Sequence, residues 1–184
     1  MKKFEEKTIH TEKIFQGKVI DLQIDDVQLP NGKTSKREIV KHPGAVAIIP
    51  LTTDNKIIFV EQYRKPLEKS LVEIPAGKLE VEESPEDTAI RELEEETGYT
   101  TKRLQYITSF YTSPGFANEL MYLYVADDLV KMEHPPKGDE DEFVELIMLT
   151  LDEAKELVEK GRIHDAKTNY AILYLEMLEL RKRC

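Results

Sequence analysis

The chain has 184 residues and a mass of 21.3 kDa, which fits one compact domain of ordinary size with a small extension. Its 26 Lys and Arg residues against 36 Asp and Glu residues give a net charge of -10, which disfavours binding to phosphate backbones and anionic lipid. We therefore expect neither nucleic acid nor a membrane as a partner. The one cysteine, Cys184, excludes an internal disulfide, and no segment approaches the roughly 20 apolar residues of a membrane span. These features favour a soluble protein of the cytoplasm.

Residues 1–42 are polar and are expected to form a β-hairpin extension. Residues 19–25 alternate between apolar and polar side chains, residues 29–33 have the composition of a turn, and residues 37–40 can form the returning strand. A two-stranded hairpin with few large side chains is marginal on its own, so it should gain burial from the main body or from a second copy of the chain. We therefore expect 1–42 to be a dimerisation element of a homodimer, followed by a main domain at 43–184.

The main domain has the pattern of a mixed, largely antiparallel sheet with about three helices. Apolar or alternating runs predict strands at 45–51, 57–64, 71–74, 104–111, 120–126 and 143–149. The first helix is expected to follow the N-cap residue Ser84, with Pro85 at its first position, and to stop at Gly98. Further helices are predicted at 151–160 and 167–181. Residues 127–142 are predicted to be a long functional loop.

Nine acidic residues lie between Glu80 and Glu96. An acidic helix is usually a solvated face paired with Arg or Lys. Here, however, Glu92 and Glu96 lie one turn apart on the border of an apolar stripe that contains Leu93, so both carboxylates should be partly sheltered. Like charges at this spacing destabilise a helix by a few tenths of a kcal/mol. A divalent cation such as Mg²⁺, which takes oxygen ligands, would compensate.

Residues 77–99 resemble the Nudix box, GX5EX7REUXEEXGU, in which U is a bulky apolar residue. Seven specified residues fall in register: Gly77, Glu83, Arg91, Glu92, Glu95, Glu96 and Gly98. At roughly 6% usage per residue type, seven coincidences come to about 10⁻⁹ to 10⁻⁸ per starting position. Tyr99 stands where an aliphatic residue is usual and keeps the bulk. The resemblance implies an α/β/α sandwich of the Nudix type and hydrolysis of a nucleoside diphosphate linked to another moiety.

The resemblance also implies roles for the residues of the box. The implied metal ligands are the carboxylates of Glu92 and Glu96, the carboxylate of Glu95 directly or through water, and the carbonyl oxygen of Ala76. Glu83 is implied to pair with Arg91 and so to tie the loop before the helix to the helix itself. The implied cofactor is Mg²⁺, for which Mn²⁺ is expected to substitute.

A second resemblance narrows the substrate. Pro114 lies fifteen residues after Tyr99, where Nudix enzymes that cleave ADP-ribose typically carry a proline. The chain length, the N-terminal extension and the segments 61–64 and 73–77 are also similar to bacterial ADP-ribose pyrophosphatases, especially those of Bacillus type. This similarity implies ADP-ribose as the substrate, AMP and ribose 5-phosphate as products, and substrate contacts from Arg37, Arg64, Glu73, Pro114, Gly115 and Phe116. An arginine fork such as that of Arg64 suits a diphosphate.

In this subfamily the carboxylate that activates water comes from the loop before a late strand. Glu142, directly before Phe143, is the predicted general base, and Glu140 is the alternative. The adenine-stacking mode stays open, because the family's aromatic clamp can be a tryptophan and this chain has none. Tyr111, Phe116 and Arg37 are the candidates for contact with the base.

Two alternatives to ADP-ribose hydrolysis stay open. One is a Nudix hydrolase of another nucleotide sugar, such as GDP-mannose. The other is a Nudix module that binds a nucleotide without catalysis, although such modules usually lack box acids that this chain keeps. The four histidines show no metal-ligand spacing, and the chain has neither a Gly-X-Ser-X-Gly elbow nor a Walker-type loop. Serine hydrolases and P-loop ATPases are therefore excluded.

Overall fold

The computed structural model describes residues 3–136, 138 and 143–183. The chain folds into two compact units. The first contains residues 1–44 and 110–121, and the second contains residues 45–109 and 122–184. The first unit therefore contains, besides the expected extension, a segment from the middle of the chain.

The first unit is built on a three-stranded antiparallel sheet with the order β1 (Lys7–Gln16), β2 (Asp21–Gln28) and β3 (Thr34–Lys41). The hairpin of β2 and β3 was expected, and Gly32 in its turn has a φ of 82°, which favours glycine. The expectation of a two-stranded extension was wrong, because β1 adds a third strand. All ten residues of β1 are exposed. A strand without a buried face does not need alternating apolar and polar residues, so its sequence carries no pattern that predicts a strand.

A buried carboxylate of β2 adds a side-chain hydrogen bond to the backbone ladder between β1 and β2. Asp25 is 6% exposed and accepts hydrogen bonds from Thr11 Oγ1 at 2.8 Å and from Gln23 Nε2 at 2.9 Å. Large apolar side chains of this unit are instead exposed, namely those of Phe4, Ile9, Ile14, Phe15, Val19 and Ile20. The sheet thus leaves apolar surface uncovered in the single chain.

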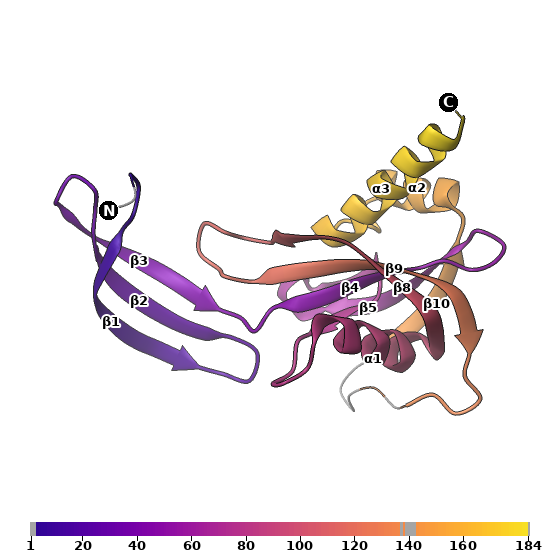
Figure 1. The fold of residues 1–184 in the computed structure, drawn as a ribbon, viewed down its shortest axis with the longest axis horizontal. Helices are drawn as coiled ribbons and strands as arrows, with labels where there is room; N and C mark the ends of the chain where they lie inside the picture. The colour runs from indigo at the N-terminus through magenta and orange to yellow at the C-terminus, as the bar shows by residue number, and fades with distance from the viewer. Residues whose placement is uncertain (1–2, 137, 139–142, 184) are drawn as a thin grey trace. The chain divides into compact units, whose positions relative to one another are not determined.

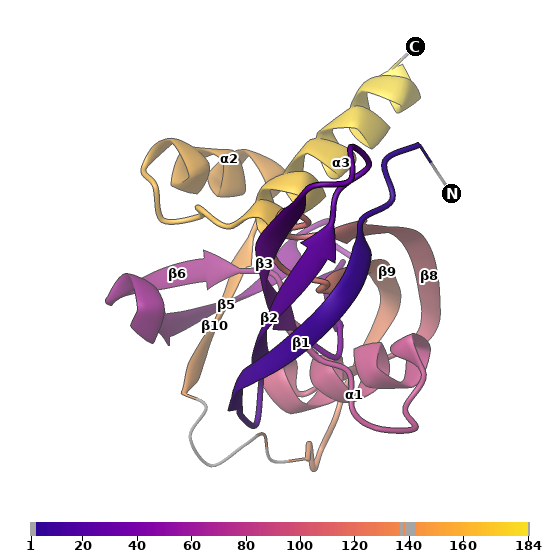
Figure 2. The same cartoon turned by 90° about the vertical axis from the view of Figure 1, so that its left-hand side faces the viewer.

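The second unit has the α/β/α sandwich that the sequence predicts. One sheet has the order β7 (Ala76–Lys78), β4 (Ala45–Pro50), β9 (Leu120–Lys131) and β8 (Tyr99–Tyr111), and the other has β10 (Val144–Leu149), β5 (Ile57–Arg64) and β6 (Lys69–Glu73). Helix α1 (Pro85–Thr97) covers one side of the strands, and α2 (Leu151–Glu159) and α3 (Ala166–Arg183) lie on the other side (Figures 1 and 2). A short 3₁₀ turn, Lys65–Leu67, connects β5 to β6.

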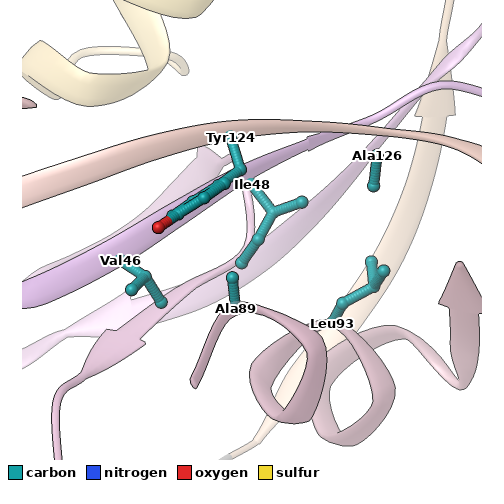
Figure 3. Close-up of a cluster of buried hydrophobic side chains, with 6 residues drawn as sticks. All are labelled: Val46, Ile48, Ala89, Leu93, Tyr124 and Ala126. Carbon is teal, nitrogen blue, oxygen red and sulfur yellow. The ribbon is translucent and has the colours of Figure 1, made fainter. Parts of the chain in front are cut away.

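Helix α1 begins and ends where its capping residues predict. Ser84 Oγ accepts a hydrogen bond from Asp87 N at 3.2 Å, and Gly98 ends the helix in the left-handed conformation with a φ of 70°. Ala89 and Leu93 pack from α1 against β4 and β9 in a buried cluster with Val46, Ile48, Tyr124 and Ala126 (Figure 3). This packing fixes which face of α1 meets the sheets.

Two local expectations were wrong in the second unit. The short strand β7 was not expected, and residues 127–131 belong to β9 although they were assigned to a long loop. Thr101 Oγ1 donates to the carbonyl of Asp127, and Met132 N donates to the Gly98 carbonyl at 2.9 Å. The first of these hydrogen bonds comes from a polar side chain and the second from the backbone. Neither requires apolar side chains, so polar residues can extend a strand beyond its apolar stretch. Within the described residues, none of the helices combines the length and the apolar content that crossing a bilayer requires.

Candidate active site

Two carboxylates of α1 are buried against β7. Glu92 and Glu96 are 8% and 7% exposed, and they lie one turn apart on the helix. Ala76 N donates a hydrogen bond to Glu96 Oε2 at 3.0 Å. A Cβ atom at position 77 would lie 1.9 Å from Cδ of Glu92, so only glycine allows the Glu92 carboxylate to occupy its place against the strand. Gly77, the first glycine of the box, is therefore needed because the Glu92 side chain lies so close to the backbone.

Arg91 connects three acids of the box, Glu83, Glu92 and Glu95. Its Nε donates to Glu83 Oε1 at 3.0 Å, and its Nη1 donates to Glu92 Oε1 and Glu95 Oε2, both at 2.8 Å. The pair with Glu83 is present as the resemblance implies, whereas the contacts with Glu92 and Glu95 were not foreseen. The hydrogen bond from Arg91, helped by one from Thr88 Oγ1, lowers the pKa of Glu83, and the carboxylates raise the pKa of Arg91. Arg91 thus compensates the charge repulsion on this face of α1.

The residues of the cluster fit a divalent cation. Glu92, Glu95, Glu96 and the carbonyl group of Ala76 offer oxygen atoms alone, the donors that Mg²⁺ and Mn²⁺ prefer. Buried carboxylates are stable only when they are paired or coordinate a metal, and Gly77 leaves room for one of them beside the strand. In the part of the chain that the structure describes, no three His, Cys, Asp or Glu side chains already surround a common centre. A bound cation would compete with Arg91 for Glu92 and Glu95.

A second charged cluster joins Arg64, the last residue of β5, to Glu73, the last residue of the antiparallel strand β6. Arg64 Nε donates to Glu73 Oε2 at 3.0 Å, and Arg64 Nη2 donates to the same oxygen. Glu73 is 2% exposed. Burial opposes the charge on Arg64, but Glu73, with smaller effects of Glu96 and Asp165, outweighs it and raises the pKa of Arg64. The negative charge of Glu96 contributes to the raised pKa of Arg64, so this cluster interacts electrostatically with the carboxylates of α1.

Sequence reasoning missed Lys167, whose Nζ lies 3.2 Å from Glu73 Oε2. A signal was available, since a cation in the first turn of a helix opposes the helix dipole and so suggests a specific partner.

The remaining predicted substrate residues belong to the first unit. Pro114 and Gly115 lie in a turn in which Phe116 N donates to the Ser113 carbonyl at 3.1 Å, and Val40 N of β3 donates to the Phe116 carbonyl at 2.8 Å. The Phe116 side chain is exposed. This turn is thus attached to the end of β3.

Arg37, the last of the predicted substrate residues, is paired with an acid of the first unit. The guanidinium of Arg37 makes a two-point contact with Glu6, at 2.8 Å from Nε and 2.6 Å from Nη2, and this contact lowers the pKa of Glu6. Its predicted role in substrate binding would require that pair to open. Glu140 and Glu142 lie outside the described residues, so the assignment of the general base stays a prediction.

Fold and site together define an α/β/α protein with an oxygen-rich cation site on one helix, and comparison with known proteins gives the family. The model of the NUDIX domain matches residues 41–170. The chain is 62% identical over 179 residues to the "ADP-ribose pyrophosphatase" of Bacillus subtilis strain 168, covering 97% of both chains. It is also 62% identical over 181 residues to the "Methanol dehydrogenase activator" of Bacillus methanolicus, covering 98% of both. The chain belongs to the Nudix family.

A solved structure supports the fold. The chain superposes on the structure titled "Crystal structure of ADP compounds hydrolase" with a TM-score of 0.84, covering 98% of this chain and 97% of that one. At 23% identity this likeness concerns the fold alone.

The Glu83–Arg91 pair predicts a pH dependence of stability. Because folding lowers the pKa of Glu83, its ionised form stabilises the folded state above the ordinary carboxyl pKa of 4.5, and that contribution is lost as the pH falls through the lowered value. Glu83→Gln should therefore lower the melting temperature at pH 7, and its difference from wild type should shrink as the pH is lowered below 4.5. Thermal denaturation followed by circular dichroism measures both.

Glu156→Gln is the matched control, because Glu156 makes an exposed pair with Lys160 at 3.0 Å. It should leave the melting temperature nearly unchanged at either pH. A Glu83→Gln protein whose deficit stays constant over this pH range would show that the Glu83 carboxylate does not contribute through its charge.

Proposed function

We propose that the protein hydrolyses the diphosphate bond of ADP-ribose, with Mg²⁺ as cofactor, and releases AMP and ribose 5-phosphate. The single observation that carries the proposal is the pair of buried carboxylates, Glu92 and Glu96, held against Ala76 and Gly77. The printed name of the 62% identical relative from Bacillus subtilis supports ADP-ribose as the substrate. A Nudix hydrolase of this kind needs a divalent metal, and the oxygen donor set favours Mg²⁺, with Mn²⁺ as a substitute.

The roles of the residues follow from their charges and partners. Glu92, Glu96 and the Ala76 carbonyl, with Glu95 directly or through water, would hold a divalent ion, and that ion would supply neutralisation of the diphosphate charge and polarisation of the attacking water. Arg91 keeps the acids of α1 in place through its contacts with Glu83, Glu92 and Glu95.

Substrate binding is assigned to a further group of residues. Arg64 presents a guanidinium to the diphosphate, and Glu73 orients that guanidinium. The other substrate contacts proposed are those of Arg37, Pro114, Gly115 and Phe116. Phe116 and Tyr111 have the exposed rings that stacking on adenine requires.

An assay of the purified protein tests the proposal directly. ADP-ribose and Mg²⁺ should give AMP and ribose 5-phosphate, whereas chelation of the metal should stop the reaction. GDP-mannose in parallel tests the alternative nucleotide sugar, and binding of ADP-ribose without any product would indicate a sensing module.

Removal of a proposed metal ligand should abolish most activity without unfolding the protein. We expect Glu96→Gln to lower kcat by at least about 10²-fold, because the amide keeps the shape but removes the charge that the cation needs. Glu94→Gln is the matched control, since Glu94 lies on the same helix at an unspecified position of the box. Near-normal turnover by Glu96→Gln at saturating Mg²⁺ would remove Glu96 from the ligand set.

Glu142 is the proposed general base. Glu92 and Glu96, when bound to a cation, are poor proton acceptors, so the base should be a carboxylate away from the ion. Glu142→Gln should lower kcat by about 10² to 10⁴-fold, the usual contribution of a general base, and leave KM nearly unchanged. The same measurement on Glu140→Gln decides between the two acids, and normal kcat in both variants would place the base elsewhere.

We also propose that the protein is a homodimer of the cytoplasm. The exposed apolar side chains of β1 and its neighbours support the dimer, because covering them would bury surface that the three-stranded sheet cannot bury itself. The single cysteine favours a reducing compartment. Light scattering should give twice the chain mass of 21.3 kDa at micromolar concentration. A mass equal to that of one chain would contradict the dimer.

A further inference from the structure

The first turn of α3 carries a sheltered lysine that contacts Glu73, the partner of Arg64. The side chain of Lys167 is only 11% exposed. Its ammonium lies 3.2 Å from Glu73 Oε2 and 3.0 Å from Asp165 Oδ1. A cation near a helix N-terminus is disfavoured by the helix dipole, and sheltering it from water adds to the cost. The carboxylates of Glu73 and Asp165 therefore compensate the unfavourable position of the lysine charge.

The start of α3 is attached to the segment that leads into the metal site. Ile74 N donates a hydrogen bond of 3.0 Å to Thr168 Oγ1, and Thr168 is fully buried. Thr168 N in turn donates to Asp165 Oδ1 at 3.0 Å. Two residues after Ile74, Ala76 N binds Glu96. The position of Lys167 is thus fixed relative to the backbone that carries Glu73 and Ala76.

Arg64 and Lys167 both contact the same oxygen of the Glu73 carboxylate. Arg64 uses Nε and Nη2 on one carboxylate oxygen, Oε2, and Lys167 approaches the same oxygen. The usual arginine-carboxylate fork uses both oxygens of the carboxylate. Lys167 therefore shares the charge of Glu73 and holds its carboxylate toward α3. The charge of Arg64 is then only partly compensated by Glu73, and attraction to a phosphate remains.

We propose that Lys167 is a positioning residue that fixes Glu73 and, through it, sets the orientation and free charge of the Arg64 guanidinium that binds the substrate diphosphate. That the ligand is a diphosphate rests on the proposed function. The effect of Lys167 on Glu73 and Arg64 does not depend on the substrate and can be measured without it.

The first test therefore uses the substrate-free protein. In ¹⁵N-labelled protein, the Nε–H resonance of Arg64, assigned from its loss in Arg64→Ala, should shift in Lys167→Met. The matched control is Lys155→Met, which removes another lysine that is paired to α3, through Glu176 at 2.7 Å, without contact to Glu73. The Arg64 resonance should stay in place in the control. Should Lys167→Met not fold, Lys167→Gln keeps an N–H donor without the charge and takes its place.

The second test uses kinetics with ADP-ribose. Lys167→Met should raise KM about tenfold, the effect of weakening one charge-assisted hydrogen bond, and change kcat by less than about twofold. Arg64→Ala should raise KM by at least as much. Because Lys167 acts through Arg64, the double variant should be no worse than Arg64→Ala alone. A loss of packing alone would lower the melting temperature and leave the Arg64 resonance and KM of the folded protein unchanged.

The outcomes separate the two hypotheses. An unshifted Arg64 resonance in Lys167→Met overturns the positioning role, whatever the substrate is. A KM effect that adds to that of Arg64→Ala also overturns it, because Lys167 would then act independently. If wild type does not cleave ADP-ribose, the proposed function fails, and the resonance of Arg64 still decides the role of Lys167.

Discussion

The guanidinium of Arg91 is the interaction on which the rest of the site depends. It binds Glu83, Glu92 and Glu95 at once, and without it these carboxylates would repel one another on a partly buried face of α1. Removing one partner of a buried charge cluster leaves the others uncompensated, which is far more costly than replacing the whole cluster. The acids needed for a cation can therefore be close together before any cation binds.

This face of α1 can form a cation site because strand β7 lies opposite it. Ala89 and Leu93 anchor α1 to β4 and β9, so the neighbouring positions 92 and 96 must meet β7. There Gly77 admits the Glu92 carboxylate and the amide of Ala76 binds Glu96. The apolar packing and the cation chemistry thus share one helix, and the residues for the two roles alternate along it.

The two units are stabilised in different ways. In the second unit, β4 and most of β5 are buried, and α1 packs on β4. In the first unit, backbone ladders join the strands, the buried carboxylate of Asp25 accepts a hydrogen bond from Thr11 of β1, and several large apolar side chains stay at the surface. A unit of this kind gains stability from burial that a further surface would supply, which is why a second copy of the chain is proposed to cover it.

The sequence alone determined the features that depend on neighbours along the chain. The bounds of α1 follow from the capping by Ser84 and Gly98, and the spacing of Glu92 and Glu96 follows from the register of one helix. The Glu83–Arg91 pair was implied by the resemblance to the Nudix box, and it lies within nine residues of the chain. Only the tertiary structure decided which distant residues meet. It revealed β1, whose exposed residues carry no burial pattern, and it brought Lys167 to Glu73 across 94 positions of the chain. Helix caps and helix faces are local and repeat with a fixed period, whereas contacts between β6 and α3 arise from packing, which leaves no periodic trace in the sequence.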